Sequence, residues 1–207
     1  TRRTSIERYA AEYGIAVVMP QADHSFYSNM KYGKNYWTFL TEELPQKARA
    51  FFPLSDKKED NFVAVLSMGG YGAFKWALNY PEKFAAAASL SGAVEIVGHV
   101  QRMREANSGQ GLDLNQPLSL VFGEDNIAET ENDLLWLLNK VDKSDQEKPI
   151  LYQACGTEDF LYNDNLAFFD VCKQTSFELK TDFGPGDHNW GYWDEKIQDV
   201  LKWLPIK

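Results

Sequence analysis

The sequence predicts an α/β domain in which a mostly parallel sheet is covered by helices on both faces. Short apolar runs alternate along the chain with longer amphipathic stretches, the pattern that parallel strands and their crossover helices produce. Most of the runs lack polar alternation, as expected of strands buried on both faces. A length of 207 residues suits a single domain spanning residues 1–207.

Five apolar runs are the strand candidates. They are Ile15–Met19, Phe62–Leu66, Phe84–Leu90, Ile150–Ala154 and Ser176–Thr181.

The predicted helices lie between these runs. The first begins at Thr4-Ser5-Ile6-Glu7, which has the spacing of a capping box, and ends at Tyr13, where Gly14 suits a C-cap. Pro45 predicts a kink or a break inside the second. The set comprises residues 4–13, Asn35–Phe52, Gly70–Asn79, Thr130–Val141 and Trp193–Leu204.

The stretch after the third predicted strand fits this alternation poorly. Several glycines, among them Gly98, Gly109 and Gly111, punctuate a polar sequence before the next helix. We predict that residues 93–127 form a cap or lid insertion rather than a second domain.

Acidic residues outnumber basic ones, and this excludes several partner classes. The chain has 30 Asp and Glu against 21 Lys and Arg, a net charge of -9 that would repel nucleic-acid phosphates. No apolar run approaches the ~20 residues of a membrane span, and no apolar segment follows the charged first residues to form a secretory signal. The two cysteines are expected to be buried and reduced. We therefore expect a cytoplasmic protein with no nucleic-acid or membrane partner.

The strongest chemical signal is a serine between a predicted strand and a predicted helix. Ser67 follows Phe62–Leu66 and precedes Gly69 and Gly70. A sharp turn there would hold the hydroxyl above the sheet edge, with the N–H of Met68 facing a developing oxyanion. Such a turn requires small residues two positions either side of the serine, a rule that Gly69 satisfies and Val65 does not. The pattern predicts a nucleophile elbow.

A serine nucleophile needs a base, and the chain offers three histidines. His24 follows the first predicted strand, and His99 lies in the predicted cap. His188 lies between the last predicted strand and the last helix, which matches the chain order Ser, Asp, His that accompanies a nucleophile elbow. We predict His188 as the base and His99 as a solvated surface residue.

The acid that orients the base should come from the loop after Ile150–Ala154. Glu158, Asp159 and Asp164 compete for this role, and we favour Asp159 because Phe160-Leu161 after it reads as an apolar anchor for the loop. Asp187 is too close to His188 along the chain to reach the far imidazole nitrogen, and we expect a turn residue there.

Three motifs, LSMGGYGAFKWAL, CGTEDFLY and GPGDHNWGYW, occur in this order and resemble the esterase D group of α/β-hydrolases, especially the tributyrin-type esterases. That branch also includes S-formylglutathione hydrolases and feruloyl or acetyl-xylan esterases. The resemblance covers essentially the whole chain. It implies the α/β-hydrolase fold, with Ser67 as nucleophile, Asp159 as orienting acid, His188 as base and Met68 as an oxyanion-hole donor.

Two features depart from the resembling family. The family has glycine at the position of Val65, so we expect a strained elbow or a shifted strand. Its members also carry N-terminal strands and a His-Gly-containing loop with a second oxyanion donor, both upstream of the point where this sequence starts. We therefore expect a hydrolase fold that lacks the N-terminal strands.

The resemblance implies a serine esterase that hydrolyses short-chain acyl esters without a cofactor. Two alternatives stay open within this chemistry: an S-formylglutathione hydrolase or other thioesterase, and an acetyl or feruloyl carbohydrate esterase. A truncated, inactive hydrolase that serves as a binding module is the alternative of another class.

Loops at the carboxyl ends of the strands should line the substrate pocket. The candidates for substrate contact are His24, Phe26, Tyr27 and Trp190. We expect no metal, because no two histidines or cysteines have ligand spacing. The expected partner is a small-molecule ester, and homo-oligomers occur in the resembling family.

Overall fold

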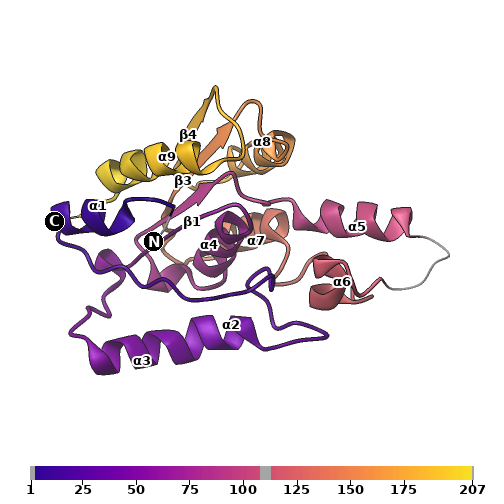
Figure 1. Cartoon of the computed structure of the whole chain (residues 1–207), viewed down its shortest axis with the longest axis horizontal. Coiled ribbons are helices and arrows are strands. Elements are labelled where there is room, and N and C mark those ends of the chain that lie inside the picture. Colours follow the sequence, from indigo (N-terminus) through magenta and orange to yellow (C-terminus); the bar gives the residue numbers. More distant parts are fainter. Residues whose placement is uncertain (1–2, 108–112, 207) are drawn as a thin grey trace.

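A four-stranded parallel sheet lies at the centre of the structure, a computed structural model that describes residues 3–107 and 113–206. Its strands are neighbours in chain order: β1 (Phe62–Leu66), β2 (Ala86–Leu90), β3 (Ile150–Gly156) and β4 (Leu179–Gly184) (Figure 1). All five residues of β2 are buried, as predicted for a strand covered on both faces.

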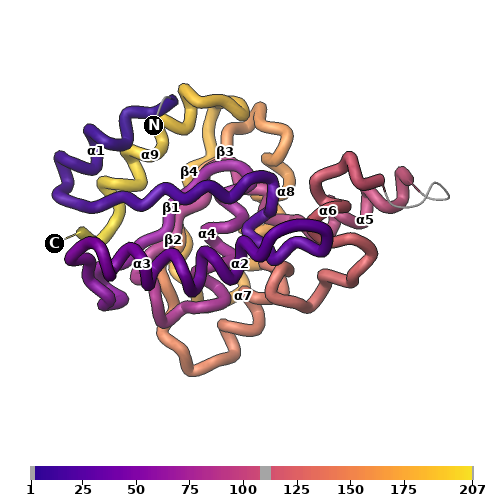
Figure 2. Tube along the Cα trace, turned by 60° about the horizontal axis from the view of Figure 1, so that its bottom comes forward, coloured from indigo at the N-terminus to yellow at the C-terminus, as the bar shows by residue number. Residues whose placement is uncertain are grey.

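Helices cover both faces of this sheet, which confirms the predicted architecture. Helices α4 (Met68–Asn79), α7 (Leu134–Asp142) and α8 (Tyr162–Cys172) pack on one face, where Phe74 stacks on Phe168 with ring centroids 4.8 Å apart. Helices α1 (Ile6–Glu12) and α9 (Trp190–Trp203) lie side by side on the other face (Figure 2). Gly14 after α1 has a φ of 64°, the left-handed conformation expected of a helix C-cap.

The predicted helix Asn35–Phe52 is continuous but irregular. Helix α2 (Tyr36–Thr38), a π-helical turn (Phe39–Glu43) and α3 (Leu44–Phe51) follow one another without a break. Pro45 is the second residue of α3 and directly follows the π-helical turn, where the regular hydrogen-bond pattern that a proline cannot continue is already interrupted. Two short 3-10 turns, Lys58–Asp60 and Pro81–Lys83, flank β1 and α4.

The predicted strand Ile15–Met19 is wrong. In the described residues this segment pairs with no strand, and Val17, Val18 and Met19 are 39%, 49% and 53% exposed. An apolar run becomes a strand only where a neighbour pairs with its backbone N–H and C=O groups. β1 is consequently an edge of the described sheet, and none of its residues is fully buried.

The last strand also differs from the prediction. β4 covers Leu179–Gly184 instead of Ser176–Thr181, because the parallel register places Leu179 opposite Leu151 of β3.

The segment predicted as a cap contains two helices, α5 (Ile96–Ala106) and α6 (Pro117–Phe122), and its residues 108–112 lie outside the described residues. α5 and α6 project from one end of the sheet (Figure 1). The N–H groups of Lys31 and Tyr32 donate to the carbonyls of Val121 and Leu120, at 2.7 and 2.9 Å, so the loop before α2 holds the end of α6.

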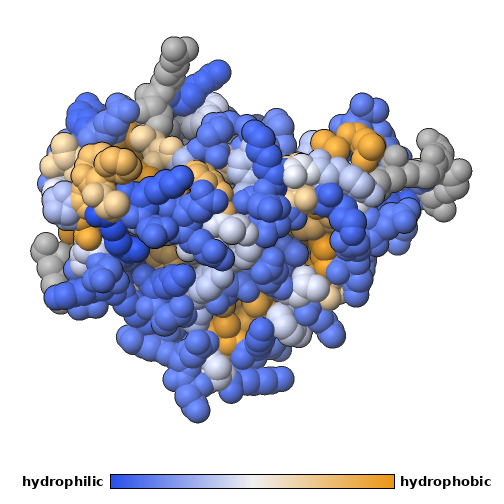
Figure 3. All heavy atoms as spheres, turned by 90° about the horizontal axis from the view of Figure 1, so that it is seen from below, coloured by the Kyte–Doolittle hydropathy of each residue, from blue (hydrophilic) through white to orange (hydrophobic). Residues whose placement is uncertain are grey.

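Hydrophilic side chains dominate the face seen in Figure 3, and apolar ones gather in separate patches. None of the described helices is long and apolar enough to cross a membrane.

Candidate active site

Ser67 occupies a sharp turn between β1 and α4. Its φ of 54° and ψ of -126° lie outside the regions that L-residues favour, so the surrounding packing must hold the backbone there. The glycines of α4 permit this packing. A Cβ on Gly70 would lie 2.8 Å from the Cα of Gly92, in the loop after β2.

Val65 fits the elbow despite its size. A Cβ on Gly69 would lie 2.1 Å from Cγ1 of Val65 and 2.9 Å from the hydroxyl oxygen of Tyr27. The valine therefore takes up the space beside the bare Cα of Gly69, and β1 stays in parallel register with β2 through Leu66. The register gives no sign of the shifted strand that was one of our two expectations for Val65.

The structure brings together the three side chains predicted for catalysis. Oγ of Ser67 lies 2.9 Å from Nε2 of His188, and Nδ1 of His188 lies 2.8 and 3.0 Å from the two carboxylate oxygens of Asp159. An ionised carboxylate only accepts hydrogen bonds, so Nδ1 carries the proton and Nε2 can accept the hydroxyl proton of Ser67. This is the geometry of a nucleophile, its base and an orienting acid.

Asp159 is buried, with 4% of its surface exposed, and its Oδ1 also accepts the N–H of Leu161 at 2.9 Å. Leu161 is 3% exposed and anchors the loop as predicted, whereas the same prediction is wrong for Phe160, which is 74% exposed. The carboxylate therefore has a fixed position from which to orient the imidazole.

The other candidate acids have partners of their own. Glu158 accepts the N–H of Gly186 at 2.6 Å, and this backbone hydrogen bond lowers the pKa of its carboxyl group. Asp187 accepts the N–H of His188 at 2.6 Å, which suits the turn residue we expected. Both bonds hold the loop that carries His188.

The prediction of a solvated His99 is wrong. Nε2 of His99 pairs with the carboxylate of Asp164, and the two side chains are only 30% and 15% exposed. Asp164, the third acid that competed for His188, is thus held by a histidine of α5. Sequence reasoning missed the pair because 65 positions separate its members.

Met68 is the first residue of α4, and the N–H of a first helical residue has no acceptor inside its own helix. It follows Ser67 directly, so its N–H is placed to donate to an oxyanion formed beside Oγ.

The predicted substrate-contact residues have different surroundings. His24 is exposed and hydrogen-bonds to none of the three predicted catalytic residues in the described part of the chain. Phe26 packs edge-on against Tyr71 of α4, with ring centroids 6.2 Å apart. Tyr27 packs its ring against Gly72 of α4, where a Cβ would lie 2.3 Å away.

Trp190 is 40% exposed, begins α9 two residues after His188, and contacts the ring of Trp193 at 5.2 Å.

Lys75 is a buried charge that sequence reasoning missed. It is fully buried in α4, and its Nζ donates to the carbonyl of Tyr27, the hydroxyl of Ser28 and the amide oxygen of Asn132 at 2.8 to 3.0 Å. Burial lowers the pKa of this ammonium to about 7. The signal in the sequence was a lysine inside the apolar helix AFKWAL. Lys75 joins the loop of Tyr27 to the segment before α7.

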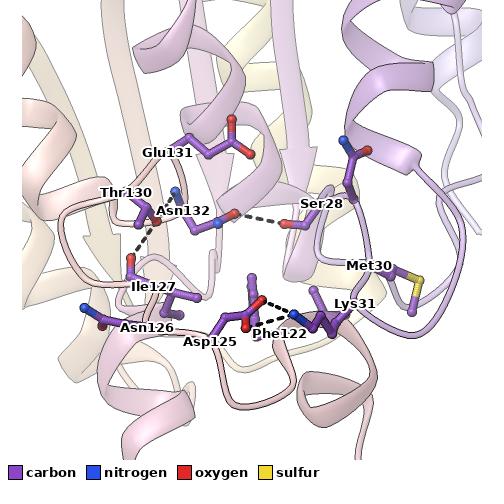
Figure 4. A pocket seen from close by; sticks show the side chains of 12 residues that line it. Ser28, Met30, Lys31, Phe122, Asp125, Asn126, Ile127, Thr130, Glu131 and Asn132 are labelled. Atoms are coloured by element: carbon purple, nitrogen blue, oxygen red, sulfur yellow. Dashed lines mark hydrogen bonds and ion pairs between the residues drawn. The ribbon is translucent and has the colours of Figure 1, made fainter.

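A cavity of about 380 Å³ lies next to this network (Figure 4). Residues of the 28–31 loop and of segment 121–132 line it, including the ion pair between Lys31 and Asp125 at 3.0 Å. None of the three predicted catalytic residues lines this cavity.

Both cysteines are buried and free, as predicted, and burial raises the pKa of the Cys155 thiol to about 12. No group of three or more His, Cys, Asp or Glu suited to a metal ion occurs among residues 3–107 and 113–206.

Comparisons with known proteins agree with this architecture. The profile of a family described as "Putative esterase" matches residues 2–204. An acetyl esterase of Caldicellulosiruptor saccharolyticus is 29% identical over 204 residues, which cover 96% of this chain and 75% of that protein.

Two solved structures from Staphylococcus aureus are each 40% identical to this chain. They are the substrate-bound fluorophosphonate-binding serine hydrolase FphF, with a TM-score of 0.85, and the apoenzyme of the S-formylglutathione hydrolase FrmB, with a TM-score of 0.82. Each match covers 98% of this chain and 76% of the other. The chain therefore belongs to this family of esterases with the α/β-hydrolase fold and is a carboxylic ester hydrolase.

Proposed function

We propose that the protein hydrolyses short-chain carboxylic esters through an acyl-enzyme formed on Ser67. Oγ attacks the ester carbonyl carbon while Nε2 of His188 takes the hydroxyl proton, and the N–H of Met68 donates to the developing oxyanion. The C–O bond then breaks, and the proton passes from Nε2 to the leaving alcohol. Water attacks the acyl carbon by the same base catalysis, releases the acid and restores the serine.

One observation carries this proposal: two hydrogen bonds connect Ser67, His188 and Asp159. Oγ of Ser67 lies 2.9 Å from Nε2 of His188, and Nδ1 of His188 lies 2.8 Å from Oδ2 of Asp159. Its acid is buried and its serine has a strained backbone, an arrangement that costs stability and is typical of catalytic sites. The similarity to an acetyl esterase supports a short acyl group.

Reaction with a fluorophosphonate tests the mechanism, because the reagent forms a covalent bond with an activated serine. We expect stoichiometric labelling of the wild type and no labelling of Ser67→Ala. The same variant should hydrolyse p-nitrophenyl acetate about 10⁴-fold more slowly, or slower still. Ser144→Ala is the matched control and should keep full activity, since this hydroxyl donates to the carbonyl of Val141 and accepts from the N–H of Gln146 within its own turn. Labelling that persists in Ser67→Ala would contradict the assignment.

A thioester is the second candidate substrate, and the 40% identity to an S-formylglutathione hydrolase favours it. The ratio of kcat/KM for S-formylglutathione to that for p-nitrophenyl formate decides between the two, since both substrates transfer a formyl group to the serine and differ in the leaving group.

We also propose that residues 93–127 act as a cap over the acyl pocket. Support comes from the pair between His99 of α5 and Asp164 of α8, because α8 begins three residues after Asp159. Deletions within α6 should change the ratio of kcat/KM values for esters of different acyl-chain length. Fluorophosphonate labelling of Ser67 should stay the same in these variants.

A further inference from the structure

Phe160 is an apolar residue that is exposed to solvent and contributes little to the packing of the core. It is 74% exposed, although the residues on either side of it, Asp159 and Leu161, are 4% and 3% exposed. The loop is thus anchored by its neighbours, and the phenyl ring adds little to the core. An exposed aromatic ring beside a reactive site is a common sign of ligand contact.

The ring lies against the predicted base. Its centroid is 4.6 Å from that of the His188 imidazole, at an interplanar angle of 45°. The imidazole also contacts Trp193 edge-on at 4.8 Å, but Trp193 is 5% exposed and donates its indole N–H to Ser91. Two rings contact the base among the described residues, and of these only that of Phe160 is open to solvent.

The chemistry of the proposed reaction places the leaving group beside this ring. When Oγ of Ser67 bonds to the acyl carbon and the C–O bond breaks, the leaving oxygen takes its proton from Nε2 of His188. That oxygen must therefore come within hydrogen-bond distance of Nε2. The alcohol attached to it begins next to the imidazole, whereas the acyl group lies at Oγ and the N–H of Met68. A ring in contact with the imidazole is therefore the candidate contact for this alcohol.

We propose that Phe160 is a specificity-determining residue that binds the leaving alcohol and selects aromatic alcohols over small alkyl ones. The inference rests on the proposed function, because it uses the path of the proton through His188. Trp190 is a second exposed ring near the base, since it is 40% exposed and contacts Trp193, whose ring contacts the imidazole. An aromatic alcohol has a flat face to pack against these rings, and ethanol does not.

Benzyl acetate and ethyl acetate test the proposal. They share the acetyl group, and their alcohols have similar basicity, so the ratio of their kcat/KM values reports contacts with the leaving group. We expect Phe160→Ala to lower the benzyl-to-ethyl ratio about three- to ten-fold, in line with the worth of an aromatic pair, and Phe160→Leu to restore part of it. The ratio for ethyl butyrate against ethyl acetate should stay unchanged, because it reports the acyl side.

Phe51→Ala is the control, since this phenylalanine at the end of α3 is 80% exposed and should leave both ratios unchanged. If Phe160 only holds the orientation of the imidazole, Phe160→Ala will lower kcat/KM for benzyl acetate and for ethyl acetate by the same factor. That result overturns the proposal. Fluorophosphonate labelling separates the two levels. An unlabelled wild type refutes the proposed function and this inference with it, whereas a labelled wild type with an unchanged benzyl-to-ethyl ratio in Phe160→Ala refutes this inference alone.

Discussion

Gly69→Ala is expected to destabilise the protein and to disable the elbow. The added methyl carbon would lie 2.1 Å from Cγ1 and 2.9 Å from Cβ of Val65, closer than non-bonded carbons approach. The two residues belong to α4 and β1, whose backbones are held by the sheet and by the turn at Ser67. Relief therefore requires the helix to move away from the strand.

The size of the effect follows from this overlap. Overpacking a core typically lowers the free energy of unfolding by about 1–3 kcal/mol. Because the new methyl group also meets the Cβ of a strand residue, we expect a loss of about 3 kcal/mol for Gly69→Ala. In a domain of this size such a loss lowers Tm by about 6–12 °C. A shift of the elbow by about 1 Å would also reduce kcat for p-nitrophenyl acetate by about 100-fold.

The companion change Val65→Gly should rescue the variant. On its own, Val65→Gly is expected to keep or raise activity, because it leaves Ser67 untouched and removes the bulk beside Gly69. In the double variant the new methyl group occupies the space that the valine left. A double-mutant cycle should then give a coupling free energy of about 2 kcal/mol in favour of the double variant.

Thermal and urea unfolding of the four proteins, together with kcat, measure this cycle. Gly184→Ala at the end of β4 is the matched control and should change Tm little, since in the described part of the chain nothing beyond its own chain neighbours lies within 4 Å of the added Cβ. Additive effects of Val65→Gly and Gly69→Ala would refute the reasoning, because they would show that the two residues do not compete for space.

Two further predictions concern buried charges. Asp159→Asn should lower kcat for p-nitrophenyl acetate by about 10⁴-fold with little change in Tm, because an amide can donate to Nδ1 and so favour the wrong imidazole tautomer; a loss below about 10-fold would contradict the role of the acid. Burial lowers the pKa of Lys75 to about 7, whereas the ordinary pKa of lysine is about 10.4. Between these two pH values the unfolded chain therefore binds more protons than the folded one, so the free energy of unfolding should rise with pH in this window. Urea unfolding at about pH 7 and about pH 8.5 should show this rise in the wild type and lose it in Lys75→Met, whereas equal slopes in the two proteins would show that Lys75 keeps its ordinary pKa.

Much of the fold and of the candidate site could be read from local patterns. The strand Phe62–Leu66, the turn at Ser67 and the helix after it depend on neighbouring residues: an apolar run, glycines and a proline beyond the helix end. His188 and Asp159 could be chosen because parallel strands bring the loops at their carboxyl ends to one edge of the sheet.

Other features could not be read in this way. Ile15–Met19 has the composition of a strand, but pairing depends on a neighbour that no local pattern supplies. His99 looked like a surface residue because its partner, Asp164, belongs to another helix. Tyr27 could be proposed as a pocket residue from its place in the chain, but the packing of its ring against Gly72 of α4 could not be predicted.

The sequence by itself determined the class of fold, the order of the elements around Ser67 and the choice of three residues for catalysis, because these follow from periodicity, turn chemistry and chain order. Only the tertiary structure decided that Asp164 meets His99, that Lys75 is buried among three acceptors, and that Phe160 stays open beside His188. These outcomes depend on contacts between segments far apart in the chain, and the free energy of such contacts is set by packing rather than by local preference.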